Sequence, residues 1–477
     1  MVLRAALLSL SLLSLASALV VNQQPLAAPT SHVARERYDG QQVYRLNFTS
    51  VDASLREEVR RAIDLLDLDV WRSTHSSIDV RASPSSIASL ERFLPGSTDM
   101  HVWISDLQSL VDAATPPLHQ PPLVDDDDVG ILGFPMDSLD TPFHDAYHSL
   151  EELYAFADQM AVRFDGDGIK VESFSVGQSF EGREIRGWKA SMDSQVFGRG
   201  QDEDQDEDPE EEQLVREFVI QSGQHAREWV GPATALYFIH SLLLSAEQDP
   251  TGPEAVLLKS FTFTIVPTIN PDGYAYSHEK SRMWRKNRQE VGSRSCAGID
   301  LNSNWGYKWR APRSTTPCSD SYPGDHAFEA VETRAMADYL ANGSTGTTTE
   351  RKVRAFIDLH SYGQLFMFPY AHSCADIPAD AEMLMEAGLG VIKSIRTVHG
   401  ETYQSGQACD LTFRAPGDAI DFTYGVTDIR WSYSAELRDT GTYGFLLPPS
   451  LIRPAAEETT AGLMYLARFI YNAEIAG

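Results

Sequence analysis

The sequence predicts an α/β protein in which an open sheet brings polar side chains together at the ends of its strands. Short apolar runs typical of buried strands cover residues 217–221, 353–359 and 429–435. Residues 229–244 follow the first run and are predicted to form a helix. Each run ends at or shortly before a histidine or a glutamate. Because the carboxyl ends of strands in such a sheet converge on one crevice, we expect these polar side chains to meet there.

A second, smaller α/β unit is predicted ahead of this sheet, over residues 38–113. Residues 42–48 alternate as a strand, and residues 53–68 carry apolar side chains at helical spacing. The elements expected after them are the segment 69–72, a strand at 77–82, a helix at 84–94 and the segment 102–111. Together these elements predict a small α/β open sandwich.

Two acidic segments interrupt the predicted elements. Residues 114–138 form a Pro-rich, acidic connector that we expect to be extended and exposed. No Lys or Arg occurs from Phe93 to Val162, so a protease of the trypsin-like or dibasic-cutting kind has no site there. Residues 201–212 are predicted to be a solvated loop, with a docking site for a basic partner as the alternative.

Composition and the first residues predict an exported protein. A chain of 477 residues can bury a large core and form two domains, and 68 acidic against 39 basic residues give a net charge of -29, which argues against a nucleic-acid partner. Residues 1–18 have the pattern of a cleaved signal peptide, and no later stretch is apolar enough to span a membrane. We expect a secreted, extracellular monomer, with the vacuole as an alternative location.

The cysteines and two sequons agree with export. The chain has four cysteines, whose spacing is too wide for one metal site that uses all of them. Disulfides fit an oxidising compartment. Asn47 and Asn342 lie in glycosylation sequons and are predicted to carry glycans.

The predicted crevice contains a candidate zinc site. His225 and Glu228 lie three residues apart, and His360 follows a second strand. Two imidazoles and a carboxylate form a catalytic zinc set that leaves a fourth position for water, so one Zn²⁺ per chain is predicted. Glu436 adds a carboxylate that can take a proton from this water and return it to a leaving amine. The alternative is a set of unrelated polar residues at strand ends.

Along nearly its whole length the chain resembles the zinc carboxypeptidases of the pancreatic A and B type. Besides the zinc motifs, the matching segments are residues 270–274, 283–286, 298–302, 360–362 and 436–441. The resemblance implies a doubly wound domain with a mixed sheet over residues 139–477. It also implies that the preceding sandwich is a propeptide that covers the active-site cleft.

The resemblance also implies a role for each residue of the site. His225, Glu228 and His360 would bind zinc, Glu436 would be the general base and acid, and Arg285 would polarise the scissile carbonyl. Asp300 would orient His225. The implied substrate-binding residues are Arg227, Asn302, Ser303, Ser361, Tyr362, Phe413 and Ile420, and the implied disulfides join Cys296 to Cys318 and Cys374 to Cys409. Expected partners are peptide or protein C-termini and the chain's own propeptide.

Two positions depart from the family at the substrate's end of the cleft. Ser303 stands where the family has an arginine that clamps the C-terminal carboxylate. At about 1.5 to 3 kcal/mol per charged hydrogen bond, losing this clamp costs about two to four decades in affinity. Phe413 replaces a mobile tyrosine, and Ile420 at the pocket base predicts preference for hydrophobic C-terminal residues. Arg414 is a candidate for a displaced anchor, although a solvated surface arginine is the favoured interpretation.

Two functions of different class follow. The main hypothesis is a secreted zinc carboxypeptidase that removes hydrophobic C-terminal residues through a weakened anchor, which Glu436 and Arg285 favour. The alternative is an inactive zinc-binding protein, similar to fungal carboxypeptidase-like pseudoenzymes linked to cell-wall organisation, which Ser303 and Phe413 favour. Those pseudoenzymes also lose the catalytic glutamate, whereas Glu436 is present in this chain.

Overall fold

The computed structural model describes eight ranges of the chain, which are residues 35–48, 53–94, 98–115, 133–193, 215–292, 296–311, 315–342 and 351–476. The expected signal peptide, most of the connector and the acidic run at 201–212 lie outside the described residues.

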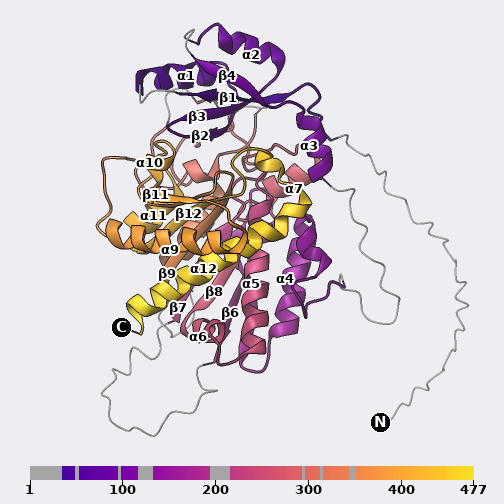
Figure 1. Ribbon diagram of the computed structural model, residues 1–477, viewed down its shortest axis with the longest axis vertical. Helices are drawn as coiled ribbons and strands as arrows, with labels where there is room; N and C mark the ends of the chain where they lie inside the picture. Colours follow the sequence, from indigo (N-terminus) through magenta and orange to yellow (C-terminus); the bar gives the residue numbers. More distant parts are fainter. Residues whose placement is uncertain are drawn as a thin grey trace, which may run out of the picture. The chain divides into compact units, whose positions relative to one another are not determined.

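A mixed eight-stranded sheet forms the centre of the larger unit, in the order β11-β10-β12-β9-β7-β8-β6-β5 (Figure 1). Its strands are β5 Ile169–Gln178, β6 Glu184–Met192, β7 Val215–Ser222, β8 Thr262–Val266, β9 Arg351–Ser361, β10 Leu365–Phe368, β11 Gln404–Gln407 and β12 Trp431–Leu437. The pairs β7–β8, β7–β9 and β9–β12 are parallel, whereas β5–β6, β6–β8 and β10–β12 are antiparallel. The predicted fold class is therefore confirmed.

Both faces of this sheet are buried, which explains why its central strands are apolar runs. Along β7, Phe218 and Ile220 belong to the core on one face and Val219 to the core on the other. On the first face α5, α9 and α12 pack beside one another (Figure 1). The helices of this unit are α4 Leu150–Phe164, α5 Val230–Gln248, α6 Pro253–Ser260, α7 Pro271–Glu279, α8 Val331–Asn342, α9 Ala381–His399, α10 Ala408–Leu411, α11 Ala419–Gly425 and α12 Ile452–Glu474.

Residues 42–114 form a separate antiparallel sheet with helices, hereafter the N-terminal sandwich. The strand order is β2-β3-β1-β4. The elements are β1 Gln42–Asn47, α1 Ala53–Leu65, β2 Asp69–Ser73, β3 Ser77–Ala82, α2 Pro84–Glu91, β4 Asp99–Ile104 and α3 Leu107–Ala114. The segment predicted at 102–111 divides into a strand and a helix because Asp106 caps α3, accepting a hydrogen bond from the Ser109 amide (3.0 Å).

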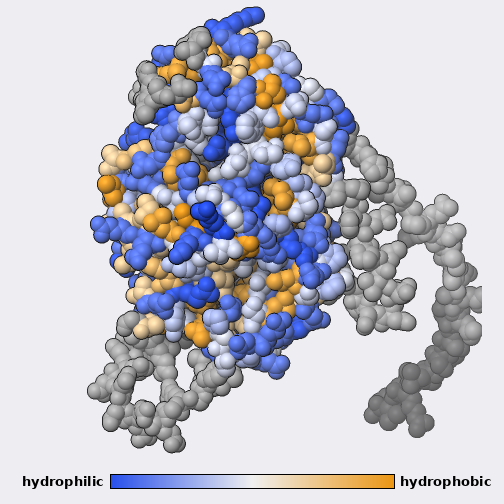
Figure 2. Space-filling model, in the orientation of Figure 1, coloured by the Kyte–Doolittle hydropathy of each residue, from blue (hydrophilic) through white to orange (hydrophobic). Residues whose placement is uncertain are grey.

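Two disulfides join Cys296 to Cys318 and Cys374 to Cys409, as the resemblance implied. Within the described ranges, no helix is long and apolar enough to cross a membrane. On the face shown in Figure 2, hydrophobic residues are scattered among hydrophilic ones. Asn47 ends β1 and Asn342 ends α8, and their glycosylation stays a prediction.

Candidate functional site

Two neighbouring parallel strands, β7 and β9, position the candidate metal ligands. His225 and Glu228 lie in the loop between β7 and α5, and His360 lies near the end of β9. The chain leaves β7 through Gly223, which has a φ of +66°, and a Cβ there would lie 2.5 Å from Thr268 Oγ1. Only glycine allows this close turn.

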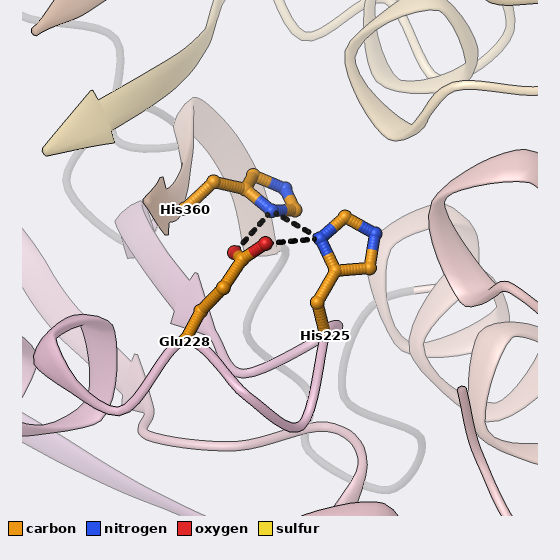
Figure 3. A group of neighbouring side chains, drawn as sticks. All are labelled: His225, Glu228 and His360. Carbon is orange, nitrogen blue, oxygen red and sulfur yellow. Dashed lines mark hydrogen bonds and ion pairs between the residues drawn. The ribbon is translucent and has the colours of Figure 1, made fainter. Parts of the chain in front are cut away.

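The three side chains point toward one another from these separate elements (Figure 3). His225 Nδ1 lies 2.8 Å from Glu228 Oε1 and 3.1 Å from His360 Nδ1. His360 Nδ1 lies 3.1 Å from Glu228 Oε2, and one ligand atom from each residue lies within 4.8 Å of the others. All three residues are buried. Two imidazole nitrogens and a carboxylate in such a cluster fit zinc.

A carboxylate faces the second nitrogen of each imidazole. His225 Nε2 lies 3.2 Å from Asp300 Oδ1, where the resemblance placed it, and His360 Nε2 lies 2.8 Å from Asp358 Oδ2. Such partners set the tautomer and orientation of a ligating histidine. Sequence reasoning missed Asp358. Asp358 stands two residues before His360 on the same strand, so both side chains lie on one face of the sheet. This spacing could have indicated that Asp358 contacts His360.

Electrostatics differ between the two carboxylates that flank this cluster. Burial of Asp300 is outweighed by Arg285 and His225, which hold the pKa of that carboxyl below its usual value. Arg285 donates to Asp300 Oδ2 over 3.2 Å. Loss of solvent raises the pKa of Glu436 to about 8, and the charge of Glu228 adds to this effect. Among the described residues Glu436 Oε2 has no hydrogen-bond partner, so it is available to a proton or a ligand.

The groups at the expected carboxylate clamp are engaged within the protein. Ser303 Oγ donates to Asp300 Oδ2 over 2.8 Å. Asn302 Nδ2 donates to Asp418 Oδ2 over 3.1 Å, and Asn302 Oδ1 accepts from the Ala419 amide over 3.0 Å. Asp418 thus accepts a hydrogen bond from the side-chain amide of Asn302, a residue for which the resemblance predicts substrate binding.

Asp418 was not predicted from the sequence, although it stands two residues before Ile420 in the same pocket segment. It caps α11 by accepting from the Ile420 amide over 3.0 Å. Gly417 precedes it with a φ of +84°, and a Cβ there would lie 2.5 Å from the Ser303 carbonyl oxygen. This close approach brings Asp418 to Asn302. Burial, together with Asp421, raises the pKa of Asp418 well above its usual value.

The remaining pocket residues predicted from the sequence lie around the same cleft. Ile420 is fully buried and lines the cleft. Phe413 is at the exposed rim, where the Arg60 guanidinium of the N-terminal sandwich lies 4.6 Å from its ring centroid. Arg414 is exposed, and its Nε donates to the His372 carbonyl over 2.7 Å. This position agrees with a surface arginine.

The N-terminal sandwich contacts the other end of the cleft. Arg227 is fully buried and donates to both Asp69 carboxylate oxygens, over 2.9 and 3.0 Å. The Tyr362 hydroxyl donates to Asp79 Oδ2 over 3.1 Å. Trp71 packs on Phe445, with ring centroids 5.0 Å apart. Sequence reasoning missed Phe445, and no local pattern marks it.

Both units line one cleft of about 1260 Å³. It includes His225, Glu228, Arg285, Ser361 and Glu436 from the larger unit. The backbone amide of Ser361 donates to Glu228 Oε2 over 3.1 Å. The sequence-predicted metal, catalytic and substrate-binding residues are therefore collected in and around one depression, with the N-terminal sandwich as part of its wall.

Comparisons with known proteins agree with this arrangement. Residues 154–462 match the zinc carboxypeptidase family. The chain is 33% identical over 466 residues to the inactive metallocarboxypeptidase ECM14 of Ajellomyces capsulatus (94% of this chain, 74% of that protein). It is 32% identical over 458 residues to the protein of the same name from Sclerotinia sclerotiorum (91% and 73%).

Solved structures are similar over both units. Carboxypeptidase A from Helicoverpa armigera has a TM-score of 0.74 at 26% identity and covers 92% of this chain and 100% of its own. The structure of thrombin activatable fibrinolysis inhibitor has a TM-score of 0.72 at 25% identity, and the match covers 91% of this chain and 99% of that chain. With its histidine and glutamate cluster at the strand ends and a match over most of its length, the chain belongs to the zinc carboxypeptidase family.

Proposed function

We propose that this protein is a zinc-binding, carboxypeptidase-like protein that binds ligands in its cleft but does not efficiently release C-terminal residues. One observation carries the proposal. At the expected carboxylate clamp, Ser303 donates to Asp300 and Asn302 donates to Asp418. Neither group remains free to hold a substrate's terminal carboxylate.

The loss of the carboxylate clamp weakens substrate binding more than it affects the hydrolytic step. Losing two charged hydrogen bonds costs about 3 to 6 kcal/mol, which corresponds to about two to four decades in affinity. Asp418 adds a buried carboxyl group at the place where a substrate carboxylate would lie. Relatives that carry the name inactive metallocarboxypeptidase support the same conclusion.

The residues for metal chemistry are nevertheless in place. His225 Nδ1, His360 Nδ1 and the Glu228 carboxylate would hold the zinc ion. Zinc in such a site polarises a carbonyl and lowers the pKa of a bound water molecule. Glu436, with one oxygen that has no partner in the described structure, would hold a proton beside it. We therefore attribute the proposed inactivity to the lost anchor.

We further propose that the N-terminal sandwich acts as a propeptide-like cover that stays attached. It engages Arg227, Tyr362 and Phe445 at one end of the cleft. The connector between the two units contains no Lys or Arg, so trypsin-like proteases have no site for its release. Export from the cell and a role in cell-wall organisation remain predictions from the sequence.

The test is release of C-terminal residues by zinc-loaded protein. Metal content is measured first, and peptides ending in Phe or Leu are then incubated with the protein before and after the connector has been cut by a protease specific for acidic residues. The matched control is Glu436→Gln. Release no faster than in this control supports the proposal. Release at the rate of pancreatic carboxypeptidase A, measured alongside, overturns it.

A further inference from the structure

We propose that Gln224 is a positioning residue of the metal site, which holds His360 in place for zinc through Asp358. The same side chain binds Asn302, so it also joins the metal site to the region of the missing carboxylate clamp. This inference rests on the zinc-binding part of the proposed function. It does not depend on whether the protein releases C-terminal residues.

The orientation of the Gln224 side chain is fixed by one neighbour. Gln224 is fully buried, and its Oε1 accepts a hydrogen bond from Trp305 Nε1 over 3.1 Å. An indole nitrogen can only donate, so the amide oxygen must face Trp305 and the amide nitrogen must face away from it. The backbone is held as well, because Asn270 Nδ2 donates to the Gln224 carbonyl over 2.9 Å. Both N–H groups of the amide are therefore directed toward other acceptors.

The first acceptor is the carboxylate that faces a metal ligand. Gln224 Nε2 donates to Asp358 Oδ2 over 2.5 Å, and His360 Nε2 lies 2.8 Å from the same oxygen. A carboxylate beside Nε2 keeps the proton on this nitrogen and leaves His360 Nδ1 free to bind zinc. Asp358 is fully buried, and Gln224 supplies a hydrogen bond that a buried carboxylate needs. Because the amide is neutral, it does so without placing a second positive charge near the metal.

The second acceptor belongs to the clamp region. Gln224 Nε2 also donates to Asn302 Oδ1 over 3.1 Å, and Asn302 Nδ2 donates to Asp418 Oδ2 over 3.1 Å. Contacts at hydrogen-bond distance thus run without a break from His360 through Asp358, Gln224 and Asn302 to Asp418. Gln224 is the member of this series that touches both halves. Loss of its amide should therefore disturb the metal site and end the influence of Asn302 on it.

A second buried glutamine offers a matched control. Gln221 of β7 lies beside Asp358 of β9 in the register of the two strands, and it is also fully buried. Neither polar atom of its side-chain amide has a hydrogen-bond partner among the described residues. Gln221 therefore shares the burial of Gln224 and a neighbour with it, but its amide takes no part in the series of hydrogen bonds.

The experiment measures the zinc dissociation constant of the full chain by competition with a chelator. Gln224→Met keeps the length of the side chain and removes its amide. We expect zinc binding to weaken about ten-fold, because loss of a group that orients a metal ligand costs about 10- to 100-fold and Gln224 acts one residue further away. Gln221→Met should leave the dissociation constant unchanged. Visible spectra of the Co²⁺-loaded proteins should change for Gln224→Met only, since they report the arrangement of the ligands rather than the stability of the fold.

Asn302→Ala tests the connection to the clamp region. It removes one acceptor of the Gln224 amide and should weaken zinc binding in the otherwise unmodified chain. Combined with Gln224→Met it should cause no further loss, because the connection is already broken. An equal additional loss in both backgrounds would overturn the link to Asn302.

Circular dichroism of the variants shows whether the fold is kept. If Gln224→Met does not fold, Gln224→Asn replaces it, because this side chain keeps an amide but is one methylene too short to reach all three partners. It should also weaken zinc binding. Zinc binding that is unchanged by substitution of Gln224, or weakened equally by Gln221→Met, would overturn the inference.

The outcome is separable from that of the proposed function. Rapid release of C-terminal residues by a protein whose zinc affinity depends on Gln224 would refute the inactive assignment and keep the positioning role. No release, together with equal zinc affinity of the unmodified protein and Gln224→Met, would do the opposite.

Discussion

Restoring a carboxylate clamp requires two changes rather than one. Ser303→Arg alone places a guanidinium next to Asp300, to which Ser303 already donates over 2.8 Å, while Asn302 Nδ2 stays bonded to Asp418. We therefore expect less than about a ten-fold gain in affinity for N-acetylleucine, a ligand with a free carboxylate, because fewer than two charged hydrogen bonds become available.

Asp418→Ser releases the Asn302 amide and keeps an oxygen that can cap α11. In the double variant Ser303→Arg/Asp418→Ser, two charged hydrogen bonds can form. At about 1.5 to 3 kcal/mol each, they should strengthen binding by about 10² to 10⁴-fold. The double-mutant cycle should give a coupling energy of about 1.5 to 3 kcal/mol between positions 303 and 418.

Calorimetric titration of the four proteins with N-acetylleucine measures this coupling. Ser303→Gln/Asp418→Ser is the matched control for size without charge and should show no comparable gain. The reasoning fails if Ser303→Arg alone reaches the affinity of the double variant, because Asp418 would then not block the clamp.

Three further predictions concern the metal, the N-terminal sandwich and pH. His225→Ala and His360→Ala should each lose the single zinc ion found by metal analysis of the unmodified protein, and full zinc occupancy in both would reject the site. Asp69→Asn should lower the free energy of unfolding by up to about 3 kcal/mol in denaturant titrations, since Arg227 and Arg81 would both lose the carboxylate they share and only Asp320, 3.7 Å from Arg227, would remain; unchanged stability would contradict the role of these ion pairs. Burial holds the pKa of His144 well below 6.5. As pH falls through about 6.5 the unfolded chain takes up a proton that the folded chain does not, so stability should fall by up to about 1.4 kcal/mol per pH unit. His144→Gln should flatten this slope in thermal melts at several pH values, and an equal slope would assign the effect to other groups.

Local patterns were sufficient for much of the fold. The strand at Ser77–Ala82 was predicted with its observed ends, because the alternation of polar and apolar residues is a property of the segment itself. The predicted helix at 84–94 ends earlier, at Glu91, since helix ends depend on packing and capping beyond the periodic pattern.

The sequence by itself determined which groups can bind a metal and which anchor is missing. His225, Glu228 and His360 have the side-chain chemistry of zinc ligands, and Ser303 has no positive charge whatever its surroundings. The types of these residues, and their positions directly after apolar runs, can be read from short segments of the sequence.

Only the tertiary structure showed which side chain lies where the family has its carboxylate clamp. Asp418 meets Asn302 across 116 residues of chain, and Asp69 meets Arg227 across 158. Both contacts arise from the packing of distant segments, which hydrophobic burial and loop geometry set for the molecule as a whole. The residues next to Asp418 in the sequence do not indicate that it contacts Asn302. Only the folded structure shows that Asp418 lies in the pocket beside Ile420.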